Sequence, residues 1–366
     1  MVAEARVSAP RRIGLVIGQL TVGGAEGQLA HVVQGLQGRF EPVVFSFADT
    51  AGALHGDLLQ RGATVHAIAG QGITRVRNLA RVLKEKRIDL VHSWLFIANG
   101  YALAARLLGV RAPLVTSARN CKVQGRASQI ANSVAFRASD AIVVNSMEVD
   151  AYIREHYRAP VDRIRLVQNG IDTERFHPPA QNGAANEPGP IISIGRLVPQ
   201  KNHELFLRAA AELVREIPRQ RFIIVGDGPL RADLERQAAE VGLADRVTFT
   251  GERRDVDALL RDASLFWLTS RWEGMPNVVL EALASGVPAI ATDVSGTRTL
   301  IRDGHDGFIV ASGDATGFVT RSRELLLDAT KMDAFRRSAR LRAYEFSIPR
   351  MIDALCAVYE EVLVGR

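Results

Sequence analysis

The sequence has few of the features that mark secreted, membrane-spanning or metal-stapled proteins. It contains only two cysteines, Cys121 and Cys356, which lie far apart and show no metal-ligand spacing. Two cysteines in so long a chain do not make a disulfide framework, so a reducing compartment is expected. No apolar run reaches the roughly 18 residues that a membrane span needs, and no signal-peptide core follows the polar start. The sequence therefore predicts a cytoplasmic protein that is soluble or peripherally bound to the inner face of the membrane.

Aromatic side chains are also scarce, and their distribution bears on the class of ligand. They make up 6% of the chain and are not interleaved with its basic residues, although the isoelectric point is about 9.7. Proteins that bind nucleic acid combine basic patches with aromatic stacking platforms. The sequence therefore argues against a nucleic-acid partner.

The residues that are abundant are typical of a globular protein with two domains. Hydrophobic residues make up 47% and charged residues 23% of the 366 positions, which suits two domains of ordinary size. The net charge of +6 is unevenly spread. Residues 1–180 contain 22 Lys and Arg against 14 Asp and Glu, and residues 181–366 contain 24 against 26. This difference suggests that the two halves bind different kinds of ligand.

Both halves alternate short β-branched runs with stretches of apolar residues at helical spacing, among them 25–36, 204–214 and 230–239. Such alternation predicts parallel strands joined by crossover helices, and hence an α/β fold. The expected strands are 13–17, 43–45, 63–68, 90–92, 114–117, 141–144 and 164–167 in the first half, and 191–194, 222–225, 247–249, 265–268 and 289–291 in the second.

The domain boundaries follow from a break in this alternation. The segment 178–190 is rich in proline, glycine and asparagine and has no periodicity, as expected of a linker. We therefore predict an N-terminal domain over 1–178, a linker over 179–190 and a C-terminal domain over 191–346. The remaining segment, 347–366, contains an amphipathic helix that needs an apolar surface to cover.

Ligands of open α/β sheets bind beyond the carboxyl ends of the strands, so the turns that follow strands are the places to search for a site. After the strand 191–194, Arg196 and Lys201 flank a proline-containing loop that opens a helix. Arginine forks onto phosphate oxygens and lysine acts as a point charge, so the loop is a candidate phosphate site. The alternative is a pair of solvated surface cations.

A second turn follows the strand 265–268 and carries two carboxylates eight positions apart, Glu273 and Glu281. A helix is expected to start near Asn277, which would direct its free amides toward an anion and place Glu281 about one turn inside. Carboxylates accept hydrogen bonds from vicinal sugar hydroxyls. The alternative for Glu281 is a favourable interaction with the helix dipole.

Two turns of the first half are weaker candidates. Gly23 and Gly24 follow the first strand, where paired glycines allow a ligand to approach the backbone; a plain tight turn explains them equally well. His92 ends the strand 90–92 and would reach a ligand from there. The alternative is a strand-end histidine bonded to the backbone.

Taken together, the motifs of the second half resemble the family 4 retaining glycosyltransferases of the GT-B fold. The resemblance spans most of that half, whereas the first half before Gln168 matches only at Gly23–Glu26, at His92 and at Asn145-Ser146. It departs from the family at Gly27-Gln28, where many members carry arginine, and at Trp94, where many carry a second histidine. The matching stretches are the Gly195–Lys201 loop, the two glutamates, Gln168–Phe176, Val225–Pro229, Phe249–Glu252, Glu281–Gly286, Asp293–Thr297 and Asp303–Gly307.

The resemblance implies a fold of two Rossmann-like domains with a cleft between them and a C-terminal helix crossing back to the first domain. The first domain would bind the acceptor and the second a nucleoside-diphosphate sugar. Arg196 and Lys201 would grip the diphosphate, Glu281 the ribose and Glu273 the transferred sugar, while Gly24 would let the first domain approach the phosphates and His92 would face the sugar. The remaining donor contacts would come from Arg253 near the base and from Gly274, Met275, Pro276, Asn277 and Val278.

The resemblance implies a retaining transfer of a sugar, from UDP- in preference to GDP-sugars, to a saccharide or lipid-linked acceptor in cell-surface polysaccharide or lipopolysaccharide biosynthesis. No Asp-x-Asp pair lies near the candidate loops, so we expect no metal and no other cofactor. Double displacement would need a carboxylate nucleophile, and the first half offers no candidate, so a front-face route is the family expectation. The alternatives are a sugar-nucleotide epimerase or a phosphorylase-like enzyme of the same fold, and a catalytically inactive partner subunit.

The positive charge of the first half suggests one further partner, an anionic membrane surface. Six basic residues cluster in one helical segment, and Arg77, Arg81 and Lys84 share one face of it. Such contacts contribute roughly 1 kcal/mol per charge near an anionic leaflet. A solvated charged face and an acidic soluble acceptor are the alternatives. The basic residues in question are Arg75, Arg77, Arg81, Lys84, Lys86 and Arg87 in the helical segment, and Arg119, Lys122 and Arg126 in a later loop.

Overall fold

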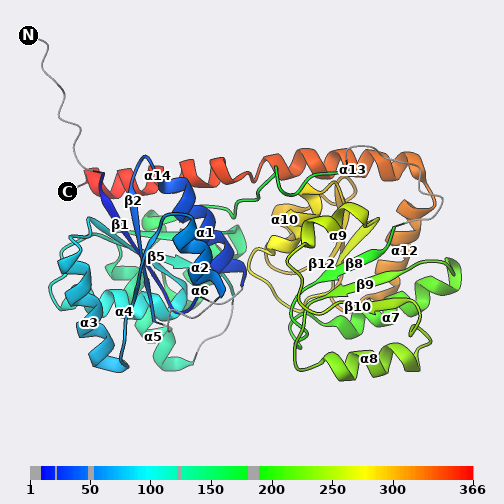
Figure 1. The fold of residues 1–366 in the computed structure, drawn as a ribbon, viewed down its shortest axis with the longest axis horizontal. Helices are drawn as coiled ribbons and strands as arrows, with labels where there is room; N and C mark the ends of the chain where they lie inside the picture. Colours follow the sequence, from blue (N-terminus) through cyan, green and yellow to red (C-terminus); the bar gives the residue numbers. More distant parts are fainter. Residues whose placement is uncertain (1–9, 21–22, 48–52, 122–124, 180–188, 366) are drawn as a thin grey trace, which may run out of the picture. The chain divides into compact units, whose positions relative to one another are not determined.

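The structure, a computed structural model, describes residues 10–20, 23–47, 53–121, 125–179 and 189–365 (Figure 1). The chain divides into two compact units. Unit 1 comprises residues 1–170 together with 348–366, and unit 2 comprises residues 171–347. Each unit is an α/β domain of Rossmann type, as the sequence predicts, because each has one parallel sheet with helices on both faces.

Unit 1 is built on a seven-stranded parallel sheet in the order β3-β2-β1-β4-β5-β6-β7. The order reverses direction between β1 and β4, which pair side by side. Each expected strand of this half is present. The strands are β1 (Arg12–Ile17), β2 (Glu41–Ser46), β3 (Thr64–Ala67), β4 (Leu90–Trp94), β5 (Leu114–Ala118), β6 (Ala141–Val144) and β7 (Ile164–Leu166).

Alternation along the strands divides the helices of unit 1 between the two faces of the sheet. On β1, Ile13 and Leu15 point to a core shared with α1 and α14, whereas Val16 points to a core shared with α3 and α4. Side chains of a strand alternate faces, so one buried strand supplies both cores. The helices are α1 (Gly24–Leu36), α2 (Ala53–Gln60), α3 (Gly72–Glu85), α4 (Leu95–Leu107), α5 (Arg126–Ala138), α6 (Met147–Tyr157), the short helix η1 (Val161–Arg163) and α14 (Ile348–Val364).

Unit 2 repeats the plan with a six-stranded parallel sheet in the order β10-β9-β8-β11-β12-β13. Its strands are β8 (Ile191–Ile194), β9 (Phe222–Val225), β10 (Val247–Phe249), β11 (Leu265–Leu268), β12 (Ala289–Thr292) and β13 (Gly307–Val310). Its helices are α7 (His203–Glu216), α8 (Arg231–Glu240), α9 (Val256–Asp262), α10 (Asn277–Ala284), α11 (Thr297–Leu300), α12 (Ala315–Leu326) and α13 (Ala329–Tyr344).

The amphipathic C-terminal helix, α14, completes the core of unit 1. It lies against α1, and its buried residues join the same core as the strands β1 and β4. Seven of its side chains are buried: Met351, Ile352, Leu355, Cys356, Val358, Tyr359 and Val362. The apolar surface that the helix needs is therefore the face of the first sheet.

The units meet in sequence at Gly170 and Ile171, earlier than the predicted boundary after residue 178. Residues 171–178 go with unit 2 because Ile171 N donates to Phe346 O at 2.8 Å and Phe176 packs in the core of that unit. Most of the predicted linker, 180–188, lies outside the described residues. Within the described ranges, no helix is both long enough and apolar enough to cross a membrane.

Candidate active site

The sheet of unit 2 brings together two loops that are distant in the sequence. Strands β8 and β11 are neighbours although two strands intervene in the chain, so the strand order reverses between them. The loop after β8 carries Arg196 and Lys201, and the loop after β11 carries Glu273. A reversal of this kind leaves a crevice at the carboxyl ends of the strands, where α/β proteins bind ligands.

Lys201 and Glu273 meet at this point. The Nζ atom of Lys201 lies 2.7 Å from Oε1 of Glu273, and the hydroxyl of Ser270 donates to the same oxygen at 2.6 Å. The side chains of Lys201 and Glu273 are 18% and 9% exposed. Since the pair is largely shielded from water, its attraction is much stronger than that of a surface pair.

Glycines allow the loops of unit 2 to pack backbone against backbone. At Gly226, φ is +132°, and a Cβ atom would lie 2.1 Å from the carbonyl oxygen of Gly195. At Gly296, φ is +80°, and a Cβ atom would lie 2.2 Å from the carbonyl oxygen of Gly274. Any other residue at either position would push a candidate ligand-binding loop out of place.

Helix α10 begins at Asn277, as the sequence predicts, and Glu281 lies one turn inside it. Glu281 is half-buried. Burial raises the pKa of its carboxyl group from an ordinary value of 4.5 to about 7, although the positive charges of Arg175 and Lys201 act to lower it. Because burial disfavours the charged form of this group, a ligand hydroxyl that donates a hydrogen bond to the carboxylate would stabilise it.

The other predicted donor contacts differ in their exposure. Arg196 is exposed on its loop, Met275 and Pro276 are buried, and Gly274, Asn277 and Val278 are half-buried. Arg253 is exposed and pairs with Asp255, whose Oδ1 accepts from Arg253 Nε at 2.7 Å. In the described part of the chain, no group of three or more His, Cys, Asp or Glu side chains is arranged to hold a metal ion.

His92 does not have the position that the sequence predicts. Its side chain is completely buried in unit 1, and its Nδ1 and Nε2 atoms each lie 2.6 Å from a hydroxyl oxygen, of Tyr359 and of Ser117. Burial, together with the charge of Arg119, lowers the pKa of His92 to about 3, so the ring is neutral at physiological pH. In this arrangement the imidazole links α14 to the sheet. The first-half glycine Gly24 begins α1.

Sequence reasoning missed two polar networks at the carboxyl edge of the first sheet. Gln28, one of the departures from the family pattern, exchanges two 2.8 Å hydrogen bonds with the backbone of Gly170. Arg119 is buried, lies 4.4 Å from the centre of the Trp94 ring and donates to Asn169 at 2.6 Å. The tryptophan at the place of the second histidine thus supports a buried arginine, a pairing that only the fold shows.

Two family models together cover most of the chain. Residues 22–175 match the model described as Glycosyltransferase Family 4, and residues 175–342 match the model described as Glycosyl transferases group 1. The D-inositol 3-phosphate glycosyltransferase of Nocardia farcinica is 32% identical over 75% of this chain and 67% of its own. The chain belongs to the group 1 glycosyltransferases of family 4.

Other relatives of this glycosyltransferase build lipid-linked saccharides. An Escherichia coli enzyme, the UDP-Gal:alpha-D-GlcNAc-diphosphoundecaprenol alpha-1,3-galactosyltransferase, is 28% identical over 79% of both chains. A Campylobacter jejuni alpha-1,4-N-acetyl-D-galactosaminyltransferase that acts on a diphosphoundecaprenol-linked saccharide is 26% identical over 96% of this chain and 99% of its own. The chain is accordingly an enzyme of the glycosyltransferase class.

Solved structures show that the glycosyltransferase has the GT-B fold. Anabaena HepE in complex with UDP superposes with a TM-score of 0.86 over 96% of this chain and 100% of its own, at 21% identity. The same protein has been solved with UDP-glucose, also with a TM-score of 0.86. At this identity the likeness concerns the fold alone.

Proposed function

We propose that the enzyme transfers a sugar, with retention of anomeric configuration, from a UDP-sugar in preference to a GDP-sugar. The acceptor is a saccharide or a lipid-linked saccharide of cell-surface polysaccharide or lipopolysaccharide biosynthesis. The observation that carries the proposal is the Lys201–Glu273 pair, which lies where the strand order of the unit 2 sheet reverses. Lys201 is also close enough to Glu281 for its charge to act on the pKa of that carboxyl group. A cation for phosphate and two carboxylates for hydroxyls are the groups that a nucleotide sugar requires.

In this mechanism the cations of unit 2 act on the leaving group. The diphosphate departs with about two negative charges, and Arg196, Lys201 and the N-terminus of α10 oppose that charge as it develops. Glu273 orients Lys201 and accepts from hydroxyls of the transferred sugar, while Glu281 accepts from the ribose. Because fixed cations and helix amides do this work, the proposed reaction needs no metal ion. His92, buried within unit 1, holds α14 in place.

The relatives support the nucleotide and the acceptor class. The name of the Escherichia coli relative states UDP-Gal as its donor, and HepE has been crystallised with UDP and with UDP-glucose. Two relatives act on saccharides linked to diphosphoundecaprenol. We therefore extend both the uridine nucleotide and a lipid-linked acceptor to this enzyme.

A panel of UDP-, GDP- and ADP-sugars tests the donor directly. The enzyme is incubated with each, and release of the nucleoside diphosphate is measured with and without an undecaprenyl-diphosphate-linked acceptor. The expected result is release from one or more UDP-sugars, faster than from any GDP-sugar. Faster release from GDP-sugars would refute the uridine preference, and conversion of the sugar without release would support an epimerase.

We extend the proposal to an anionic membrane surface as the place where the enzyme meets its acceptor. Helices α3, α4 and α5 lie side by side on one face of the unit 1 sheet, with α4 contacting both others. Exposed residues that are basic or apolar lie on all three helices, and we call the set given below the α3–α5 surface; Thr74 and Glu85 of α3 are exposed as well, and Glu85 pairs with Arg81. Its basic members are Arg77, Arg81, Lys84 and Arg126, and its exposed apolar members are Ile73, Ile97, Leu107, Leu108, Ile130 and Val134.

The structure removes two of the basic residues that the sequence predicts for contact with the membrane. Arg119 is buried over Trp94, and Arg75 is half-buried beside the rings of Phe47 and Tyr101, so neither offers its charge to a membrane as predicted. Lys122 lies outside the described residues. The basic and apolar parts adjoin, since Lys84 Nζ donates to Leu108 O at 2.7 Å.

Vesicle co-sedimentation tests the α3–α5 surface. Binding to vesicles that contain phosphatidylglycerol, but not to pure phosphatidylcholine, is expected, and high salt should release it because exposed charges are screened. The double variant Arg77→Ala/Lys84→Ala should lose binding, while the control Arg215→Ala/Arg219→Ala, two exposed arginines of unit 2, should keep it. Absence of binding to both vesicles at low salt would leave a soluble acidic acceptor as the better explanation.

A further inference from the structure

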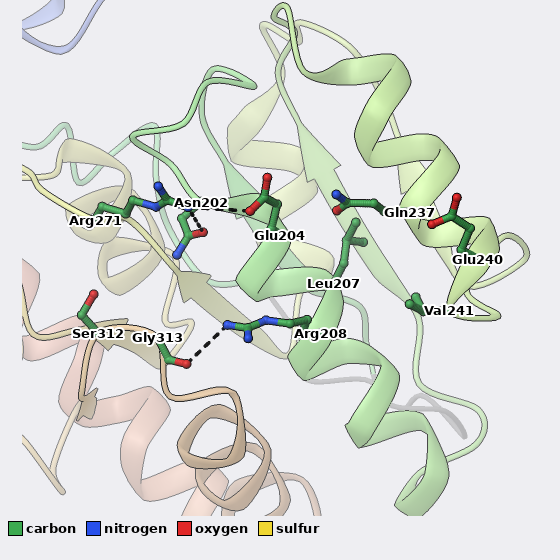
Figure 2. Close-up of a pocket in the computed structure, with 10 residues that line it drawn as sticks. All are labelled: Asn202, Glu204, Leu207, Arg208, Gln237, Glu240, Val241, Arg271, Ser312 and Gly313. Atoms are coloured by element: carbon green, nitrogen blue, oxygen red, sulfur yellow. Dashed lines mark hydrogen bonds and ion pairs between the residues drawn. The ribbon is translucent and has the colours of Figure 1, made fainter.

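Unit 2 contains a cavity of about 730 Å³ that none of the proposed donor-binding residues lines. Figure 2 shows its walls, which come from the start of α7, the end of α8 and the loops after β11 and β13. Its volume falls within the range of about 300–1,000 Å³ that is usual for small-molecule sites. The lining residues are Asn202, Glu204, Leu207, Arg208, Gln237, Glu240, Val241, Arg271, Ser312 and Gly313.

The lining carries no net charge, because two arginines are balanced by two glutamates. Arg271 lies 3.7 Å from Glu204 and donates to Asn202 Oδ1 at 3.3 Å, so its charge is already shared within the wall (Figure 2). Arg208 is directed at the carbonyl oxygen of Gly313, at 3.4 Å. Among the lining residues, Arg208 is thus the one cation without a carboxylate partner, and a single such cation is not the cluster expected of a phosphate site.

The other lining groups suit a neutral, polyhydroxylated ligand. Asn202 and Gln237 each offer an amide donor and an amide acceptor, and Ser312 adds a hydroxyl. Val241, which is 45% exposed, adds apolar surface for the C–H face of a sugar ring, whereas Leu207 is buried in the core of unit 2. A few oriented polar groups combined with apolar patches are typical of a binding site.

One wall of the cavity adjoins the Lys201–Glu273 pair. Asn202 follows Lys201 in the chain, and Arg271 N donates to Gln200 O at 2.8 Å, which ties the two loops together. The next residue, Trp272, has 46% of its surface exposed, and Gln200 holds its backbone through a 3.0 Å bond to Trp272 O. The other two tryptophans, Trp94 and Trp267, are buried.

We infer that the cavity binds a stretch of neutral saccharide, as a subsite for the acceptor or the extended product, with the exposed indole of Trp272 as a stacking surface beside it. The inference rests on the proposed function for the identity of the ligand as glycan. A glycan held there would lie beside the loops that carry Lys201 and Glu273. The subsite would therefore contribute to acceptor affinity, whereas the nucleotide would bind independently of it.

Direct binding of three neutral probes tests the inference: maltotriose, mannotriose and triacetylchitotriose. Binding is measured by saturation-transfer NMR and by quenching of tryptophan fluorescence with acrylamide. Acrylamide should reach only the exposed Trp272, so a bound probe should reduce the quenching. At least one probe should bind, with little effect of salt. Glu240→Ala/Gln237→Ala should weaken that binding about tenfold, corresponding to roughly 1.4 kcal/mol. Glu235→Ala is the matched control, since Glu235 lies on the same helix but pairs with Arg231.

The inference is overturned if none of the three probes binds, if the double variant binds as tightly as the wild type, or if inorganic phosphate competes the probe away. UDP is titrated in parallel to separate this result from the proposed function. Intact UDP binding without saccharide binding would refute the subsite alone. Absence of UDP binding would refute the donor site, whatever the trisaccharides do.

Discussion

Lys201 and Glu273 are 72 positions apart in the sequence, yet Nζ of the first lies 2.7 Å from Oε1 of the second. The contact exists because β8 and β11 are neighbours in the sheet. It joins a group proposed to meet phosphate to a group proposed to meet the sugar, so each positions the other.

Lys201→Ala should lower both activity and stability. The leaving diphosphate loses a cation, so kcat should fall more than donor affinity. The substitution leaves the largely buried carboxylate of Glu273 without its partner. The free energy of unfolding should therefore fall by about 3 kcal/mol. Steady-state kinetics and urea unfolding measure the two effects. Adding Glu273→Gln should recover stability but not kcat, and a kcat near the wild-type value in Lys201→Ala would refute the assignment.

Arg196→Ala should lower kcat without lowering stability. Arg196 is exposed, and removing an exposed side chain usually changes the free energy of unfolding by less than about 0.5 kcal/mol. The loss should appear chiefly in kcat, because the guanidinium opposes charge that grows in the transition state. Arg215→Ala is a suitable exposed control. Equal kcat in the two variants would make Arg196 an ordinary surface cation.

Glu281→Ala should remove useful donor binding. Two ribose hydroxyls lose their acceptor, and each lost charge-assisted bond costs about 1.5–3 kcal/mol. Calorimetric titration with UDP measures the change. Comparable affinities in wild type and variant would show that Glu281 does not hold the ribose.

Glu281 should also make the stability of the free enzyme depend on pH. The pKa of Glu281 is about 7 in the folded state, above the ordinary 4.5. The contribution of its protonated carboxyl group to the free energy of unfolding is therefore fully present below pH 4.5 and is lost as pH rises through 7. The shift corresponds to at most about 3 kcal/mol for a half-buried group. Glu281→Gln should therefore unfold at a higher temperature than wild type at pH 8 and at nearly the same temperature at pH 5. A difference independent of pH would contradict the raised pKa.

Activity should survive chelation of divalent metals. Arg196, Lys201 and the N-terminus of α10 are proposed to take the place of a metal ion at the diphosphate. Rates of donor turnover are compared before and after treatment with EDTA and dialysis. A complete loss that Mg²⁺ or Mn²⁺ restores would mean that these groups are not sufficient.

Much of the fold could be predicted from the sequence because buried parallel strands are near-continuous apolar runs. Strand β13 was missed because it begins with Gly307, directly after the turn 304–306, so the start of the strand reads as part of the turn. The motifs indicated that Lys201 and Glu273 belong to one site, but not that they touch, since their contact depends on the order of strands in the sheet.

His92 illustrates what local patterns could not show. A polar residue at the end of a strand is a reasonable ligand contact until another element covers it. The periodicity of the C-terminal helix indicated an apolar face that includes Tyr359. It did not indicate that the hydroxyl of Tyr359 would meet His92, because 267 positions separate the two residues.

Because α14 completes the core of unit 1, that core can form only after the last residues of the chain have been translated. The ribosome makes residues 10–170 first, at about 5–20 residues per second, but their core still lacks the seven buried side chains of α14. Residues 171–347 emerge next and contain every strand of their own sheet. The second unit can therefore mature while the first still exposes the groove that α14 will fill. A nascent chain halted before residue 348 should present that groove to chaperones.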